Sequence, residues 1–218
     1  MKRFTRVLSV AVIALAFAEG PALAQNLRAG AKFGIDFADL GGDVQDTKIK
    51  TGFSAGAFFG ADLGTMFRLG IDGQYVQKGA KADEGNVGLE DLKIKLDYVE
   101  FMVPFSVLVP TQGSFTPRFF AGPAVAFEAS CKLAARVEGI PVDIDCDDED
   151  IGLKTKSVDF GLFVGLGADV ALGTGAFTFD LLYNFGLSDI NDVAELNESF
   201  KNKNIQITIG YALLFGGS

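Results

Sequence analysis

Eight stretches of the chain alternate bulky apolar residues with small or polar ones. In the last of them, 204–215, Ile205 and every second residue after it are bulky and apolar, whereas the positions between them include Gln206, Thr208 and Gly210. A repeat of two residues is typical of a β-strand with two different faces. The pattern predicts strands at residues 27–37, 52–63, 67–75, 93–109, 115–128, 158–172, 177–187 and 204–215.

The connections between these stretches alternate in length. Those after the second, fourth and sixth strands are short turns, such as Gly64-Thr65 and Gly173-Thr174-Gly175. The others run to about 13 to 27 residues, longer than most connections in compact domains. This predicts an all-β fold, an eight-stranded antiparallel up-and-down β-barrel with the turns at one rim and the long loops at the other. Pairing of the last strand with the first closes the barrel and leaves no sheet edge open.

The direction in which the apolar face points decides between two kinds of barrel. A soluble lipocalin-like barrel turns its apolar face inward, whereas a membrane barrel turns it toward lipid. Most of the 21 Phe residues occupy the bulky face, and within the strands Phe58, Phe120 and Phe163 occupy the other. The interior of an eight-stranded barrel is only just wide enough to be filled by side chains, so it has no room for so many rings. The apolar face is therefore predicted to point outward into lipid, as a transmembrane β-barrel requires.

The strand lengths fit a membrane. About 11 residues at roughly 3.3 Å each, tilted by about 40°, rise roughly 28 Å, and the apolar band of outer-membrane barrels is about 25 Å tall. The chain has no Trp, so Tyr75, Tyr98 and several Phe residues are expected to form the aromatic belts at the two membrane surfaces. The predicted location is the outer membrane of a Gram-negative bacterium, with the turns in the periplasm and the long loops outside.

The first 24 residues have the features of a cleaved export signal. Lys2 and Arg3 make the start basic, 7–18 is apolar, and 22–24 is a small-x-small cleavage site, Ala-Leu-Ala. The apolar run of about 12 residues is too short for a membrane helix, which needs about 20. We therefore expect a signal peptide at residues 1–24 and a single outer-membrane β-barrel domain at residues 25–218.

Charge and composition narrow the possible functions. Removal of residues 1–24 would leave 16 Lys and Arg against 27 Asp and Glu, so no basic surface for nucleic acid is expected. The chain has no His, which removes Ser-His-Asp and Cys-His catalysis. Carboxylates are so numerous that no catalytic pair stands out. We predict neither an enzyme nor a cofactor.

Cys131 and Cys146 lie in the connection between the fifth and sixth predicted strands. An even pair of cysteines in an exported chain predicts a disulfide, which by closing this loop would stabilise the fold by up to about 3 kcal/mol. The same connection has six acidic residues within 143–150, without the spacing of an EF-hand. They are interpreted either as a solvated acidic loop or as a weak divalent-cation site, and we assign no metal ligand.

The face opposite the apolar one carries the charged residues that the barrel would enclose. The predicted lumen network consists of Arg28, Lys32, Asp36, Asp62, Arg68, Asp72, Asp97, Glu100, Arg118, Glu128, Asp159, Asp169 and Asp180. One interpretation is a packed network of salt bridges and hydrogen bonds that leaves no open channel. The other is a narrow water-filled passage whose acidic excess favours cations.

Several short motifs follow one another in order between residues 27 and 215. They are Gly30-x-Lys32-x-Gly34, residues 74–80 (Gln-Tyr-Val-Gln-Lys-Gly-Ala), Tyr98-Val99-Glu100 with Pro104, Ala121-Gly122-Pro123, residues 183–187 (Tyr-Asn-Phe-Gly-Leu) and a last strand ending in Tyr211 and Phe215. In this order and spacing they resemble the outer-membrane β-barrel domain of small porin-family proteins, similar to the eight-stranded OmpA membrane domain and OmpX barrels. The resemblance implies that Tyr211 and Phe215 belong to the signal that the barrel-assembly machinery recognises.

The sequence therefore predicts an integral outer-membrane protein of the cell envelope, with a structural or surface-contact role or a narrow pore. Its expected partners are outer-membrane lipids, the barrel-assembly machinery and extracellular ligands that reach the long loops. The alternative is a soluble periplasmic lipocalin-like barrel that binds a ligand. That protein would be extracted without detergent, whereas a membrane barrel requires it.

Overall fold

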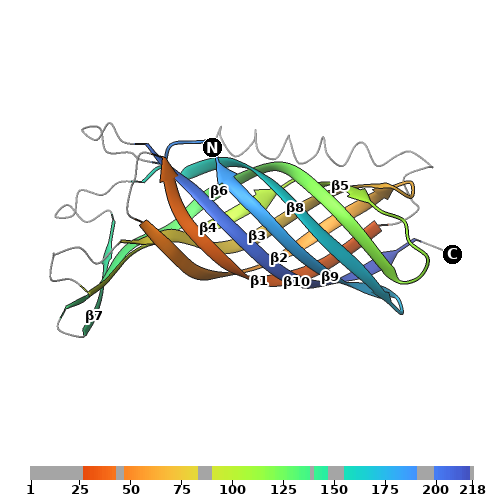
Figure 1. Cartoon of the computed structure of the whole chain (residues 1–218), viewed down its shortest axis with the longest axis horizontal. Coiled ribbons are helices and arrows are strands. Elements are labelled where there is room, and N and C mark those ends of the chain that lie inside the picture. Colours follow the sequence, from red (N-terminus) through yellow and green to blue (C-terminus); the bar gives the residue numbers. More distant parts are fainter. Residues whose placement is uncertain are drawn as a thin grey trace, which may run out of the picture.

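The computed structural model describes residues 27–42, 47–82, 90–137, 140–146, 155–190 and 199–216, and the predicted signal peptide lies outside them. Ten antiparallel strands form one sheet that curves into a barrel (Figure 1). Their bounds are Leu27–Gly42 (β1), Thr47–Leu63 (β2), Phe67–Ala82 (β3), Glu90–Met102 (β4), Phe105–Leu108 (β5), Phe115–Val137 (β6), Ile140–Asp145 (β7), Val158–Leu172 (β8), Gly175–Gly186 (β9) and Phe200–Phe215 (β10). In this part of the chain, no helix is long and apolar enough to cross a membrane.

The first and last strands close the barrel. β1 pairs with β10 along its whole length, from Leu27 opposite Phe215 to Gly42 opposite Phe200, and β2 pairs with β3. β4 and β5 are two parts of one barrel strand, because both pair with β3 on one side and with β6 on the other. They are interrupted at Pro104, which has no N–H to donate to the ladder. With β7 pairing only at the end of β6, the ring has eight strands, which confirms the predicted fold.

The strands extend further at the loop rim than the apolar pattern predicts. β1 continues to Gly42 and β2 begins at Thr47, so residues 43–46 connect them in place of the expected long loop. β6 likewise continues to Val137 and pairs with β7. Hydrogen bonding between strands does not require an apolar face, so the sheet continues where the lipid-facing pattern has ended. The turn rim is as expected, with residues 173–174 joining β8 and β9.

The apolar face of the barrel points outward. Phe33, Phe119 and Phe160 are 65%, 60% and 57% exposed, whereas Phe120 and Phe163, on the opposite face of the same sheet, are 7% and 2% exposed. Large apolar side chains exposed over the whole height of a barrel wall need lipid around them. The orientation predicted from the volume of the Phe side chains is confirmed, and it disfavours the lipocalin-like alternative.

Tyr98 is not part of the outer aromatic belt, so that expectation is wrong. Its side chain is fully buried in the lumen, where Asn202 Nδ2 donates a hydrogen bond of 3.2 Å to the hydroxyl and Lys78 Nζ lies 5.4 Å from the ring centre. The next residue, Val99, is 41% exposed on the outer wall. Since neighbouring residues of a strand point to opposite faces, Tyr98 must point inward.

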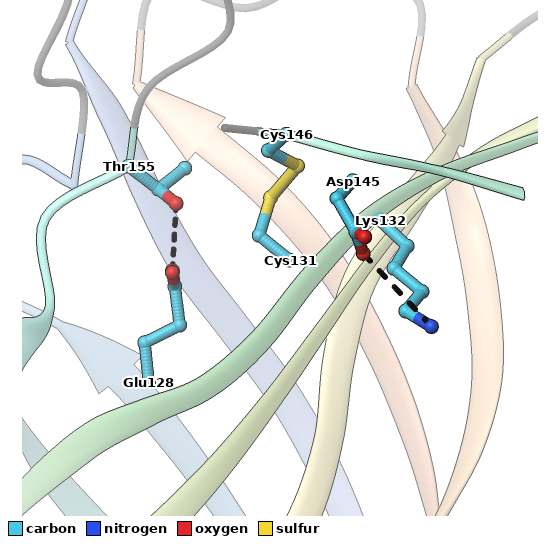
Figure 2. Close-up of a disulfide and its surroundings, with 6 residues drawn as sticks. All are labelled: Glu128, Cys131, Lys132, Asp145, Cys146 and Thr155. Carbon is cyan, nitrogen blue, oxygen red and sulfur yellow. Dashed lines mark hydrogen bonds and ion pairs between the residues drawn. A yellow bond between two sulfur atoms is a disulfide. The ribbon is translucent and has the colours of Figure 1, made fainter. Parts of the chain in front are cut away.

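A disulfide ties the β6–β7 hairpin at its base (Figure 2). Cys131 and Cys146 have their Cα atoms 5.4 Å apart, and Cys146 N donates to Cys131 O at 3.1 Å. Lys132 Nζ lies 3.9 Å from Asp145 Oδ1 in the adjacent pair of the hairpin. The predicted disulfide is confirmed, and it fixes a hairpin that extends beyond the ring of the barrel (Figure 1).

We expect Leu166→Arg to impair insertion, because this side chain is 53% exposed on the outer wall near the middle of β8. A lipid-facing Arg costs about 2 to 4 kcal/mol at the bilayer midplane and about 0 to 1 kcal/mol near the interfaces. Leu172→Arg, at a 61% exposed position at the turn end of the same strand, is the matched control. Urea unfolding in lipid vesicles measures both free energies. Equal losses at the two positions would contradict this placement of the membrane.

Candidate functional site in the barrel lumen

The inner wall of the barrel carries most of the charged residues that the sequence assigns to it. Twelve of the thirteen predicted residues lie on this wall: Arg28, Lys32, Asp36, Asp62, Arg68, Asp72, Glu100, Arg118, Glu128, Asp159, Asp169 and Asp180. Eight of them are buried, and Asp62, Asp72, Glu128 and Asp180 are partly exposed. Glu128 lies at the loop rim, where it accepts a 2.7 Å hydrogen bond from Thr155 Oγ1 (Figure 2).

Asp97 lies on the outer wall, so its assignment to the lumen is wrong. It is three residues from Glu100, and the side chains of two such residues emerge on opposite faces of a strand. Glu100 is 1% exposed inside the barrel, whereas Asp97 lines a hollow on the outer wall with Lys93 and Lys95. Counting the alternation back from the lipid-facing Val99 would have placed Asp97 correctly.

Asp169 is the centre of a charged cluster near the turn rim. Arg28 Nη1 and Arg68 Nη1 lie 2.5 and 2.6 Å from its Oδ2, and Arg118 Nε lies 3.4 Å from its Oδ1. The three arginines come from β1, β3 and β6, and Asp169 comes from β8. The contacts of Arg28 and Arg68 cross the lumen, whereas Arg118 lies on the neighbouring strand. One carboxylate thus connects four strands of the ring.

Other carboxylates balance the remaining positive charge of this cluster. The salt bridges that complete it are Asp62–Arg68 at 2.5 Å, Asp180–Arg118 at 2.6 Å and Lys32–Asp72 at 2.6 Å. Together with the contacts of Asp169 they join four cations to four carboxylates. Charges taken out of water are tolerated when they are paired and hydrogen-bonded in this way.

Two glycines of β8 make room for these side chains. A Cβ atom at Gly167 would collide with the carboxylate of Asp180, and one at Gly165 would collide with the ring of Phe120. The side chains of the neighbouring strands therefore lie directly over the β8 backbone. This close approach fits a lumen that is only just wide enough for its contents.

An apolar layer lies beside the charged cluster, on the side of the loop rim. Met102, Phe120, Phe163 and Leu182 pack together and are 1 to 7% exposed. The cavity that remains between the layer and the cluster has a volume of about 40 Å³. One water molecule needs roughly 10 to 15 Å³, so the cavity has room for only a few water molecules.

Glu100 is the centre of a second polar group, nearer the loop rim. Lys78 Nζ and Asn184 Nδ2 donate to its Oε1 at 2.6 and 2.9 Å, and Gln74 Nε2 donates to its Oε2 at 2.8 Å. One cation and two amides therefore satisfy a carboxylate that is 1% exposed. Asn184 joins β4 to β9 across the lumen, and the contacts of Lys78 and Gln74 join it to the neighbouring strand β3.

Amide side chains of β10 hold two further carboxylates. Asp36 Oδ1 accepts hydrogen bonds from Gln206 Nε2 at 2.9 Å and from Asn204 Nδ2 at 3.1 Å. Asp159 Oδ2 accepts one from Asn202 Nδ2 at 2.9 Å. These amides satisfy acceptors on the buried carboxylates without adding charge to the lumen.

Lys78 and the amide side chains are absent from the predicted lumen network. The apolar pattern of the third strand ends at Tyr75, and so does the predicted strand, although the alternation from Arg68 through Gln74 places Lys78 on the inner wall. The amides are absent because the predicted network contains charged residues only. Polar residues at every second position of β10 were the signal that could have identified them.

Part of the acidic cluster 143–150 lies on β7. Asp143 accepts a contact of 3.0 Å from Lys95, and Asp145 faces Lys132, whereas residues 147–150 lie outside the described residues. Within the part of the chain that the structure describes, no group of three or more acidic, His or Cys residues is arranged to hold a metal ion. The two interpretations of this cluster therefore remain predictions.

The comparison with protein families decides what kind of barrel this is. Residues 9–212 match the outer membrane protein beta-barrel domain. The chain belongs to this family. It is an integral protein of the outer membrane, in agreement with the outward-facing apolar wall. No curated protein sequence matches this outer-membrane barrel.

Two solved outer-membrane proteins have a similar fold. The outer membrane protein OprG from Pseudomonas aeruginosa aligns with a TM-score of 0.56 and 16% identity, over 89% of this chain and 97% of that chain. Neisserial surface protein A aligns with a TM-score of 0.51 and 14% identity, over 86% of this chain and 96% of that chain. Identities this low show only that these outer-membrane barrels share a fold. The role of this chain has to be inferred from its own residues.

We expect Asp169→Asn to destabilise the barrel more than Asp62→Asn. Without the Asp169 carboxylate, Arg28, Arg68 and Arg118 lose their common anion, and removal of one partner from a buried ion pair costs about 3 to 5 kcal/mol. Asp62 is the matched control, because its side chain is 21% exposed against 7% for Asp169. Urea unfolding of the refolded variants in lipid vesicles measures the two losses. A larger loss for Asp62→Asn would contradict the central position of Asp169.

Proposed function

We propose that this outer-membrane barrel is a closed envelope protein with a structural and surface-contact role. The observation that carries the proposal is the contact of Arg28, Arg68 and Arg118, from three different strands, with the single carboxylate of Asp169. These long side chains cross the lumen at one level. An ion would have to separate buried salt bridges to pass them.

The apolar layer is a second barrier in the same path. Met102, Phe120, Phe163 and Leu182 fill the next level of the lumen. A hydrophobic constriction excludes water and therefore opposes the passage of ions. Two successive barriers of different chemistry favour the packed-network interpretation of the lumen over the water-filled passage.

The loop rim supports a role in surface contact. β6 continues to Val137 and forms a hairpin with β7 that the Cys131–Cys146 disulfide ties. A rigid extension of a membrane barrel holds residues in fixed positions above the membrane, where extracellular ligands can reach them. We place those ligands at the loop rim. No catalytic activity is proposed, since the lumen carboxylates serve as partners for buried cations and amides.

We expect the wild-type barrel to show no steady single-channel conductance in planar bilayers. Phe120→Ala with Phe163→Ala should increase the frequency of brief openings, because both rings belong to the apolar layer. Phe119→Ala with Phe160→Ala is the matched control, since these rings are on the lipid-facing wall of the same two strands. A steady current through the wild type that the lumen variant leaves unchanged would favour the narrow pore instead.

Export and assembly complete the proposal. Residues 1–24 would direct export as a cleaved signal peptide, and the barrel-assembly machinery would recognise Tyr211 and Phe215 on β10. Both side chains face outward, 38% and 50% exposed, and the ring of Tyr211 lies 5.1 Å from that of Phe177. β10 must also pair with β1 to close the ring, so its recognition would precede closure.

We expect Tyr211→Ala with Phe215→Ala to reduce the amount of assembled barrel in the outer membrane several-fold. Phe115→Ala with Phe119→Ala removes two exposed rings at the same spacing from β6 and should have a smaller effect. Heat-modified mobility of outer-membrane fractions on a gel measures the assembled protein. Equal reductions in the two double variants would show that aromatic area alone matters, and would count against a signal on β10.

A further inference from the structure

A layer of polar side chains lies between two apolar layers inside the barrel. On β4, Tyr98 belongs to an apolar cluster at the loop rim, Met102 belongs to the apolar layer beside the charged cluster, and Glu100 lies between them. Apolar packing on both sides separates the polar layer from bulk water. Besides Glu100 it contains six side chains that are 0 to 4% exposed, Asp36, Ser54, Gln74, Asn184, Asn204 and Gln206.

Asp36 is the carboxylate of this layer that lacks a counter-charge. Lys78 Nζ lies 2.6 Å from Glu100 Oε1, whereas no Lys or Arg of the described residues forms a salt bridge with Asp36. Lys50 donates to Lys78 O at 2.7 Å and lines the hollow on the outer wall beside Asp97. The polar layer therefore keeps one negative charge unbalanced. A buried charge without a partner is strongly destabilising.

Buried oxygen atoms of the same layer have no hydrogen-bond partner among the described residues. Asn204 Nδ2 and Gln206 Nε2 both donate to Asp36 Oδ1, and Oδ2 accepts no hydrogen bond. The amide oxygens of Asn204 and Gln74 and the hydroxyl of Ser54 also lack partners. Gln206 connects this group, because its Oε1 lies 3.4 Å from Gln74 Nε2. Unsatisfied polar atoms that are buried in this way point to a bound water or ion.

Asp159 shows how such a carboxylate is otherwise satisfied. It too forms no salt bridge within the described residues, but its Oδ1 accepts from Ser188 Oγ at 2.8 Å and its Oδ2 from Asn202 Nδ2 at 2.9 Å. Both of its oxygens therefore have partners. Of the carboxylates that the structure describes on the inner wall, Asp36 combines a missing counter-charge with an oxygen that accepts nothing.

A cation meets both needs of Asp36 at once. Water would satisfy the acceptors and leave the charge, and a proton on Oδ2 would remove the charge and could donate to only one of the remaining oxygens. Carboxylate and carbonyl oxygens are typical ligands of hard cations. Ca²⁺ takes about six to eight oxygens, and Mg²⁺ requires a nearly ideal octahedron. A smaller set of oxygens with one negative charge suits a monovalent ion.

We propose that Asp36, together with Ser54, Gln74 and Asn204, binds one monovalent alkali cation inside the barrel. These ligands come from β1, β2, β3 and β10, so the cation stabilises the region where the first and last strands close the ring. The site goes beyond the surface-contact role and does not depend on it. It requires only the fold and the polar layer.

Urea unfolding of the refolded protein in zwitterionic lipid vesicles tests the site. Sodium chloride replaces N-methylglucamine chloride at constant ionic strength, so that the screening of charges stays fixed. A cation that binds only the folded state lowers the unfolding equilibrium constant, by about tenfold for each tenfold rise in sodium above the dissociation constant. We expect this dependence in the wild type and in the matched control Asp159→Asn, and none in Asp36→Asn.

Gln74→Met keeps the test decisive if Asp36→Asn folds poorly. This change removes one amide oxygen and leaves Asp36 in place, so the sodium dependence should begin at a concentration several-fold higher. An unchanged onset would overturn the proposal, and so would a sodium dependence that Asp36→Asn retains. Wild-type stability that does not respond to sodium would assign a proton or a water to Asp36 instead. An equal effect of calcium at concentrations a hundredfold lower would show a divalent site and would also overturn the proposal.

Discussion

The narrow interior of an eight-stranded ring is the constraint on which the rest of this structure depends. It cannot contain the Phe side chains of the chain, so these rings lie on the outer wall and require lipid. The inner wall is left to glycine, to a few rings such as Phe120 and Phe163, and to charged side chains. Because little space remains for water, each buried charge needs a partner from another strand of the ring.

The same contacts that make buried charge tolerable also fill the lumen. Asp169 draws together arginines from three strands, and Glu100 connects its own strand to two others. Such contacts brace the ring across its diameter and occupy the path that an ion would follow. With the lumen closed as proposed, the surface of the barrel is the part that remains for contact with other molecules.

The sequence was sufficient for the fold and insufficient for the partners within the site. Alternation, the number of Phe residues and the two cysteines predict the ring, the lipid-facing wall and the disulfide. Alternation counted from the lipid-facing Val99 places Tyr98 inside and Asp97 outside, the reverse of the prediction. Which carboxylate meets which arginine depends on the stagger of the strands around the ring, and an alternating pattern carries no information about stagger.

The position of a charge relative to the lipid-facing belt determines what it can bind. A row of lysines on the sheet of a soluble protein would form a hydrated surface. On the outer wall of β3 and β4, Lys81, Lys93 and Lys95 lie within a few residues of the last lipid-facing side chains, Tyr75 and Val99, and Lys95 pairs with Asp143 there. Net charge summed over the chain therefore predicts its partners poorly, because a membrane barrel presents different charges to the lumen, the headgroups and the solvent.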